Sequence, residues 1–281
     1  VDSGGNVYVA DQNNRTIRKI TPNGAVSTWA GQAGNFGSAD GAGSVAQFGF
    51  PNGVAVDGAG NVFVSDGGSH TIRKITPEGV VSTLAGLAGS SGSADGTGEA
   101  ARFFNPAGVA VDALGNVFVA DLNNQTIRKI TPAGVASTLA GLAGSFGNVD
   151  GTGTAARFAN PAGITVDGAG NVYVANSEGQ TIRKITPVGA VSTLAGLAGN
   201  SGSAGGTGEA ARFQQPRGVA VDSAGQVYVA DTNNQMIRKI TPSGSVSTVA
   251  GVAGYGSADG IGSVARFNQP RGVAVDNAGQ V

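Results

Sequence analysis

The chain has 281 residues, of which 40% are hydrophobic and only 12% are charged, with 17 Lys and Arg against 18 Asp and Glu. A net charge of −1 provides no basic field for phosphate groups, so the composition disfavours nucleic acid as a general partner. The absence of cysteine excludes disulfides and thiolate metal sites, and no apolar run is long enough to insert into a membrane.

The main feature of the sequence is the segment TIRKITP, which returns every 55 residues. It begins at Thr16, Thr71, Thr126 and Thr181, and a fifth copy begins with Met236. A fixed step of this size indicates one supersecondary unit copied five times, and such units bury their apolar faces only against each other. We therefore expect a residue present in every copy to serve the fold, whereas a residue that breaks the pattern is a better functional candidate.

The copy between residues 106 and 158 shows the predicted elements most clearly. In chain order, β-strands are predicted at 108–112, 116–121, 126–131 and 135–140, with a D-x-x-G or P-x-G turn between neighbours. Short turns between four strands predict an antiparallel meander. The first two strands are apolar at nearly every position, which is typical of strands covered on both faces, and the fourth is expected at the exposed edge. A single helical turn is predicted at Glu99–Phe103, inside a long connection.

Four-stranded sheets repeated in this way predict an all-β protein, a β-propeller of five four-stranded antiparallel blades. No segment keeps an apolar spacing of 3.6 over ten residues, which excludes a helical solenoid. The first copy lacks its innermost strand, and we expect the C-terminal strand at Gly272–Asp276 to complete that blade. The alternative is an open arc of five blades from a six-bladed or larger parent. In either case residues 1–281 are expected to form one domain, a fragment of a longer protein.

The pattern P-x-G-V-A-V-D-x-x-G-N-V-Y-V-A-D-x-x-N-x-x-I-R-K-I resembles the NHL repeat, and the resemblance covers essentially the whole chain. The adjoining A-D-G-x-G-x-A-A-R-F loop is similar to the loops of long-linker NHL arrays in bacterial extracellular proteins. This resemblance implies a β-propeller in an extracellular or periplasmic location. It leaves the function open, because NHL propellers include protein binders, RNA binders and a few enzymes.

Acidic residues recur at three places in the repeat. The acid in the loop, as in Asp95, stands alone, whereas calcium needs several closely spaced oxygen ligands. The acid that ends the second strand, as in Asp121, is Asn176 in the fourth copy, which favours hydrogen bonding over metal ligation. The third place is the first position of each D-x-x-G turn, where a carboxylate caps backbone N–H groups, although a ring of cation ligands is the alternative. These turn acids are Asp57, Asp112, Asp167, Asp222 and Asp276. We expect no metal and no cofactor.

Other repeated side chains also have structural interpretations. Arg128 and Lys129, like the equivalent pairs in the other copies, project to opposite faces of the third strand, and a solvated or turn-paired role is expected. Trp29 occupies a position held elsewhere by leucine or valine and is expected in the core. One phenylalanine per copy is expected to plug a loop onto the core: Phe48, Phe103, Phe158, Phe213 and Phe267.

Four residues break the repeat pattern within loops that are expected to share one face. His70 replaces arginine or glutamine, and Glu178 replaces asparagine. Arg217 and Arg271 precede the innermost strands of adjacent copies, where two guanidinium groups can clamp a carboxylate or sulfate. The alternative is surface variation without a function. These four are the candidate ligand-binding residues.

We interpret the chain as a non-catalytic binding scaffold that presents long loops to a protein or glycan ligand. No catalytic residue is assigned, because His70 is the only histidine and no G-x-S-x-G nucleophile elbow occurs. One alternative is a metal-dependent propeller enzyme of lyase or sugar-lactonase type. Another is an RNA-binding NHL domain, for which only Arg217 and Arg271 offer basic charge. The protein is expected as a monomer or a strand-swapped oligomer, because near-identical blades exchange easily.

Overall fold

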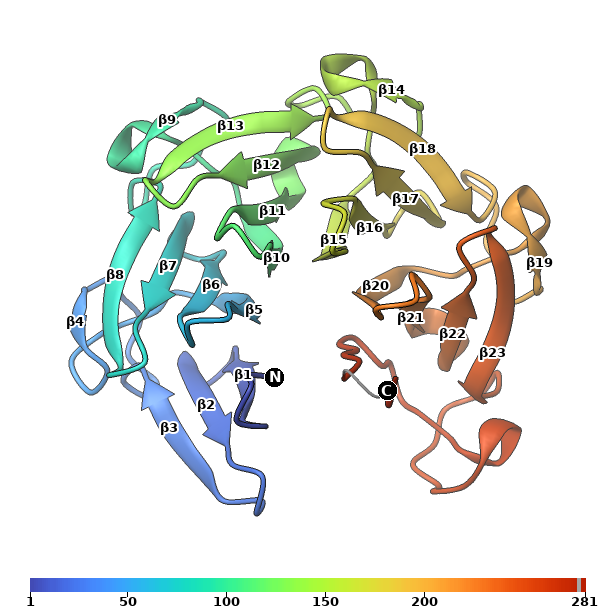
Figure 1. Ribbon diagram of the computed structural model, residues 1–281, viewed down its shortest axis with the longest axis horizontal. Helices are drawn as coiled ribbons and strands as arrows, with labels where there is room; N and C mark the ends of the chain where they lie inside the picture. The colour runs from blue at the N-terminus through green and yellow to red at the C-terminus, as the bar shows by residue number, and fades with distance from the viewer. Residues whose placement is uncertain (277–278) are drawn as a thin grey trace. The chain divides into compact units, whose positions relative to one another are not determined.

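The computed structural model describes residues 1–276 and 279–281, and the chain is an all-β propeller protein with five blades (Figure 1). It divides into two compact units, Val1–Leu139 and Ala140–Val281. The single domain expected over residues 1–281 stays a prediction.

Unit 1 contains the first three blades, all antiparallel. The first is a sheet of three strands in the order β1 (Val7–Asp11), β2 (Thr16–Ile20) and β3 (Val26–Ala30). The second has the order β4-β8-β7-β6-β5, with β4 (Gly41–Ala42), β5 (Pro51–Val56), β6 (Val62–Asp66), β7 (Thr71–Ile75) and β8 (Val80–Ala85). The third has the order β10-β11-β12-β13-β9, with β9 (Gly96–Thr97), β10 (Pro106–Val111), β11 (Val117–Asp121), β12 (Thr126–Ile130) and β13 (Val135–Ala140).

Unit 2 contains two blades with the same design. The fourth has the order β14-β18-β17-β16-β15, with β14 (Gly151–Thr152), β15 (Pro161–Val166), β16 (Val172–Asn176), β17 (Thr181–Ile185) and β18 (Ala190–Ala195). The fifth has the order β19-β23-β22-β21-β20, with β19 (Gly206–Thr207), β20 (Pro216–Val221), β21 (Val227–Asp231), β22 (Met236–Ile240) and β23 (Ser245–Gly251).

Helical structure in the described residues is confined to single 3₁₀ turns of three residues. They are η1 (Gly98–Ala100), η2 (Leu122–Asn124), η3 (Gly153–Ala155), η4 (Gly208–Ala210), η5 (Thr232–Asn234) and η6 (Gly262–Val264). The turn η1 lies close to the single helical turn predicted at Glu99–Phe103, with Glu99 in its first turn.

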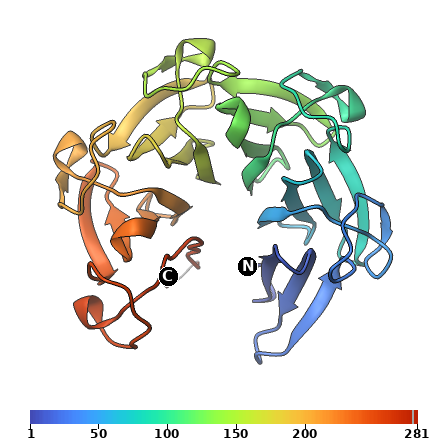
Figure 2. The ribbon, with the colours of Figure 1, turned by 180° about the vertical axis from the view of Figure 1, so that it is seen from behind.

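The four-stranded meander is confirmed, but the prediction that its outer strand is an exposed edge is wrong. In the second to fifth blades, a two-residue strand from the preceding linker pairs with the outer strand, as Gly96 pairs with Ala136 and Thr97 with Val135. Seen from behind in Figure 2, the linker before the second blade lies over its outer strand, where β4 pairs with β8. The linkers therefore cover strand edges that would otherwise be free to pair with other chains.

The C-terminal strand predicted over Gly272–Asp276 is not formed, and the first blade has three strands. A strand exists only where its backbone groups pair with a neighbour, so β-branched residues alone do not make one. Asp276 does begin the same turn as in the other copies, since its N–H donates to the carbonyl oxygen of Gln280 at 3.0 Å. The middle of that predicted turn, residues 277 and 278, lies outside the described residues.

Each hydrophobic core lies between two successive blades of one unit and includes the intervening linker. One cluster joins Ile17 of the first blade to Val62 and Ile75 of the second through Phe48 of the linker. Phe48, Phe103, Phe158 and Phe213 are fully buried, which confirms their predicted role as plugs. Burying one such ring contributes about 1.5–3 kcal/mol. Adjacent blades of one unit are therefore held together by the linker as well as by direct contact.

The first strands of neighbouring blades approach each other closely at a glycine. A Cβ atom on Gly53 of β5 would lie 2.8 Å from the carbonyl oxygen of Ala107 in β10, closer than real Cβ atoms come. The P-x-G pattern at the start of each copy is therefore a packing requirement between blades of a unit. The short distance between these first strands also brings the residues next to the glycines on neighbouring blades close together.

Candidate functional site

A buried arginine on the third strand of each complete blade fixes the preceding linker. In the third blade, Arg128 Nη1 donates to the carbonyl oxygen of Arg102 at 2.8 Å, and Nη2 donates to that of Ala94 at 3.0 Å. The guanidinium carbon lies 5.0 Å from the ring centroid of Phe103. We call this set of contacts the linker latch. Its arginines, all fully buried, are Arg73, Arg128, Arg183 and Arg238.

Two carboxylates complete the latch. Arg128 lies 2.7 Å from Asp95 of the linker and 3.2 Å from Asp121 at the end of β11. Burial raises the pKa of Asp121 to about 6, against the hydrogen bonds from Asn124 and Phe104 and the charge of Arg128, which lower it. The structural role predicted for the arginines is therefore present, but the expectation of solvation is wrong. The guanidinium groups are enclosed because the linker folds over them from more than 25 residues earlier in the chain.

Asn176 shows how the latch adapts when the buried acid is missing. Its Oδ1 accepts the N–H of Ala159 at 2.7 Å, and its Nδ2 donates to Asn148 Oδ1 at 2.6 Å. In the third blade the corresponding oxygen, Asp121 Oδ2, instead accepts from Asn124 Nδ2 at 2.7 Å, and the counterpart of Asn124 in the fourth blade is Gly179. Sequence reasoning missed Asn148. The sequence does contain a signal: position 148 is asparagine, whereas the other linkers have serine at the equivalent position. This change occurs in the fourth copy, the same copy in which Asn176 replaces the buried aspartate.

The D-x-x-G acids hold their own turns. Asp112 Oδ1 accepts the backbone N–H groups of Leu114 at 2.9 Å and Asn116 at 2.8 Å, and Oδ2 accepts the Asn116 side chain. In the turns of Asp2, Asp167 and Asp222 a tyrosine adds a hydroxyl donor, as from Tyr173 to Asp167 at 3.1 Å. The carboxylates of Asp57, Asp112, Asp167, Asp222 and Asp276 all accept backbone N–H groups in this way.

His70 and Glu178 occupy corresponding regions of different blades. His70 is the last residue of the turn between β6 and β7, with a positive φ of 61°, and its Nδ1 accepts the backbone N–H of Asn105 at 3.2 Å. Its ring meets Phe104 edge-on, with centroids 5.7 Å apart. Glu178, in the turn between β16 and β17, is exposed to solvent. The two residues belong to different units.

Arg217 and Arg271 lie near each other in unit 2. Arg217 is the second residue of β20, and the next residue, Gly218, makes a close approach to the carbonyl oxygen of Arg271. Thr232 anchors the second segment by donating its hydroxyl to the carbonyl oxygen of Pro270 at 2.8 Å. Arg217 is half-buried, Arg271 is exposed, and Arg217 Nε is buried without a hydrogen-bond partner among the described residues. Burial and, second, the positive charge of Arg271 lower the pKa of Arg217.

The described residues contain no group of three His, Asp or Glu side chains placed to hold a metal ion. Nor does the described part of the chain contain a helix of the length and apolarity needed to cross a membrane. The two neighbouring guanidinium groups thus form the most distinctive polar feature outside the latches and turns.

These blades, with their linkers and buried latches, define a repeat protein of the β-propeller class. The family model of the NHL repeat matches residues 48–75, 103–130, 158–185 and 213–240. Each match runs from the buried phenylalanine of a linker to the last isoleucine of the third strand. The chain is therefore an NHL-repeat β-propeller, and the resemblance found in the sequence is confirmed.

Similarity to known proteins extends over most of the chain. NHL repeat-containing protein 2 of Bos taurus is 30% identical over 315 residues, covering 98% of this chain and 42% of that protein. The chain spans less than half the length of the curated relatives that it matches. An auxiliary nutrient binding protein from Bacteroides ovatus has a TM-score of 0.70 at 18% identity, over 97% of this chain and 61% of the other. A streptogramin B lyase has a TM-score of 0.62 at 15% identity, over 99% and 72% of the two chains. These likenesses to solved structures concern the fold alone.

Proposed function

We propose that this protein is a non-catalytic binding scaffold for a protein or glycan that carries carboxylate or sulfate groups. The observation that carries the proposal is the pair Arg217 and Arg271, two guanidinium groups on neighbouring segments of unit 2. An anion placed between them would relieve their mutual repulsion.

The other charged groups of the repeat support this proposal by being engaged elsewhere. The latch arginines are buried against their linkers, and the turn acids accept backbone N–H groups. A carboxylate or sulfate therefore meets little competition at Arg217 and Arg271 from acidic side chains. A binding role is also consistent with the nutrient binding protein that shares the fold. We place the protein outside the cytoplasm, as the similarity to extracellular linker arrays implies.

Isothermal titration calorimetry with polygalacturonate and with poly-glutamate, against neutral dextran as a control, tests the proposal. We expect the two polyanions to bind, dextran not to bind, and the Arg217→Gln/Arg271→Gln variant to lose more than about tenfold in affinity. Raised salt should weaken binding, because salt screens the attraction between the polyanion and these solvent-accessible guanidinium groups.

Arg157→Gln is the matched control, because the side chain of this half-exposed arginine of unit 2 donates to the nearby carbonyl oxygens of Thr154 and Ala156. It should bind like the unmodified protein. Equal losses in both variants, or polyanion binding that survives the double substitution, would contradict the proposed site.

A further inference from the structure

Three side chains of unit 1 that depart from the repeat pattern lie together on its surface. Arg15 is in the turn between β1 and β2, whereas Phe36 and Phe50 belong to the linker before the second blade. The guanidinium carbon of Arg15 lies 5.4 Å from the ring centroid of Phe36 and 5.5 Å from that of Phe50, and the two ring centroids are 6.1 Å apart. We call these three residues the aromatic clamp.

The clamp lies between the first and second blades, both of which belong to unit 1. Phe36 is 57% exposed and Phe50 is 41% exposed, while Arg15 is half-buried. The position equivalent to Phe36 in the next linker of the same unit is Ser91, which is exposed as well. Ser91 is exposed although the blade before it carries a linker of its own. Exposure at this position is therefore a property of the repeat.

The sequence of this junction differs from the other copies at several positions together. Arg15 stands where they have histidine or glutamine, Phe50 where they have asparagine or glutamine, and Phe36 where two other linkers have serine. Gly68, in the turn between β6 and β7, stands where they have asparagine or glutamate. A Cβ atom on Gly68 would lie 2.6 Å from Phe50 Cδ2, so the glycine makes room for the ring. These linked departures indicate a requirement that the repeat fold itself does not impose.

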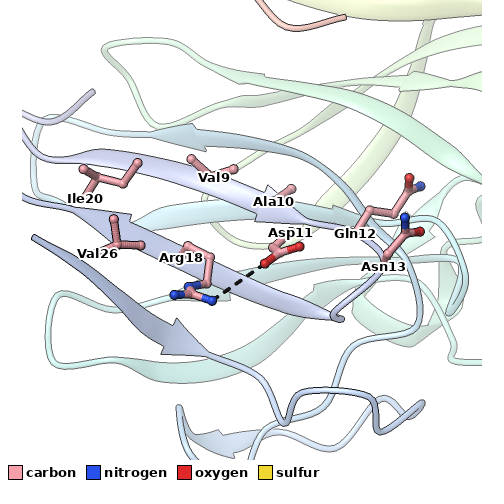
Figure 3. Close-up of a pocket in the computed structure, with 8 residues that line it drawn as sticks. All are labelled: Val9, Ala10, Asp11, Gln12, Asn13, Arg18, Ile20 and Val26. Carbon is pink, nitrogen blue, oxygen red and sulfur yellow. Dashed lines mark ion pairs between the residues drawn. The ribbon is translucent and has the colours of Figure 1, made fainter. Parts of the chain in front are cut away.

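The positive charge of the clamp is not compensated by an acid. Arg15 Nη1 donates to the carbonyl oxygen of Gly34 at 2.8 Å, and no carboxylate in the described part of the chain forms an ion pair with Arg15. Asp11 is the acid nearest in sequence, and it accepts from Asn14 at 2.9 Å and pairs with Arg18 at 3.8 Å (Figure 3). The clamp therefore presents an unpaired guanidinium beside two exposed apolar rings.

This chemistry fits a protein segment better than other classes of ligand. Protein interfaces are enriched in aromatic residues and arginine, and arginine is frequent among the residues that carry most of the binding energy. The two rings are inclined at 66° to each other. They form an angled apolar surface, which suits a side chain better than a flat sugar ring or a base. The unpaired guanidinium calls for a carboxylate. The matching occupant has acidic and apolar residues side by side.

We propose that the aromatic clamp binds an acidic segment of a partner protein. An apolar side chain of the segment packs against the rings of Phe36 and Phe50, and a neighbouring carboxylate pairs with Arg15. The clamp belongs to unit 1, whereas Arg217 and Arg271 belong to unit 2, so this surface does not depend on the anion site proposed above.

Fluorescence anisotropy with short labelled peptides tests the proposal. The probe repeats the unit Glu-Phe-Gly, and two matched peptides repeat Lys-Phe-Gly and Glu-Ser-Gly. All binding is measured in the Arg217→Gln/Arg271→Gln background, which removes the other anion site. We expect the probe to bind and each matched peptide to bind more than about tenfold more weakly, because one lacks the carboxylate and the other lacks the apolar ring.

The variant Arg15→Gln/Phe36→Ser/Phe50→Asn replaces each clamp residue by a type that other copies have at that place. We expect it to lose more than about tenfold in affinity for the probe, with no fall in melting temperature, because the repeat already folds with these residues. Phe146→Ser is the matched control. Phe146 holds the position of Phe36 in another linker and is 58% exposed, so its substitution should leave binding unchanged.

Several results would overturn the proposal. They are failure of the probe to bind, binding that survives the triple substitution, equal binding of the Lys-Phe-Gly peptide, and an equal loss on Phe146→Ser. Displacement of the probe by polygalacturonate would identify an acidic glycan as the occupant instead. A triple variant that melts at a markedly lower temperature would show that the clamp serves to pack the linker.

Discussion

His70, Gln180 and Gln235 occupy one position of the repeat and share one contact despite their different side chains. His70 Nδ1 accepts from the N–H of Asn105 at 3.2 Å, and Gln180 Oε1 accepts from that of Gln215 at 2.7 Å. Gln235 makes the corresponding bond at 2.5 Å. The sequence marks His70 as a break in the pattern, but the break preserves the acceptor. Residue type alone did not reveal this, because the partner lies about 35 residues further along the chain.

We expect His70→Gln to leave the free energy of unfolding within about 0.5 kcal/mol of the original, since the amide oxygen replaces Nδ1. His70→Ala should cost about 1 kcal/mol, because it leaves the Asn105 N–H without its acceptor. Chemical denaturation at neutral pH measures both, and Glu178→Gln serves as an exposed control. If His70→Gln proved as costly as His70→Ala, the ring contact with Phe104 would be the stabilising interaction instead.

The linker and the blade it covers form the packing unit, and the sequence predicted this unit only in part. Strand positions and the buried phenylalanines follow from apolar pattern and repetition. The burial of Arg128 did not follow, because its acceptors lie 26 and 34 residues earlier, on a loop whose path the local pattern does not specify. The two-residue strands were missed for the same reason, since β9 is a strand only through its pairing with β13.

The buried acid of the latch gives this unit a pH dependence. Burial raises the pKa of Asp121 in unit 1 and of Asp231 in unit 2 to about 6, from an ordinary value of 3.8. A folded state with the raised pKa binds the proton more tightly, so this contribution to stability is complete below pH 3.8 and is lost as pH rises through 6. Each carboxyl should therefore add about 1 kcal/mol of stability between pH 7 and pH 5.

Denaturant unfolding at pH 5 and pH 7 measures this difference. The Asp121→Asn/Asp231→Asn variant is the control, because asparagine occupies the equivalent position naturally at Asn176 and does not titrate in this range. Its stability should change less between the two pH values than that of the unmodified protein. An equal change in both proteins would show that other groups cause the pH dependence.

Across the chain, repetition made the blade architecture predictable, because five near-identical copies reveal which positions pack and which turn. Function is less predictable from the repeats, because we expect a binding site at the few positions where the copies differ, and there repetition gives no information. Arg217 and Arg271 were found as such differences.

Metal content separates a binding scaffold from the alternative of a metal-dependent lyase or lactonase. In the described residues the repeated carboxylates accept turn N–H groups or pair with latch arginines, and no three of the ligating side chains gather. We therefore expect elemental analysis of protein purified without chelator to find no stoichiometric cation, and EDTA to leave the melting temperature unchanged. A cation that binds only the folded state would raise the melting temperature. We therefore expect added Ca²⁺ or Mn²⁺ to leave the melting temperature unchanged. A bound cation whose removal destabilises the protein would favour the enzyme alternative.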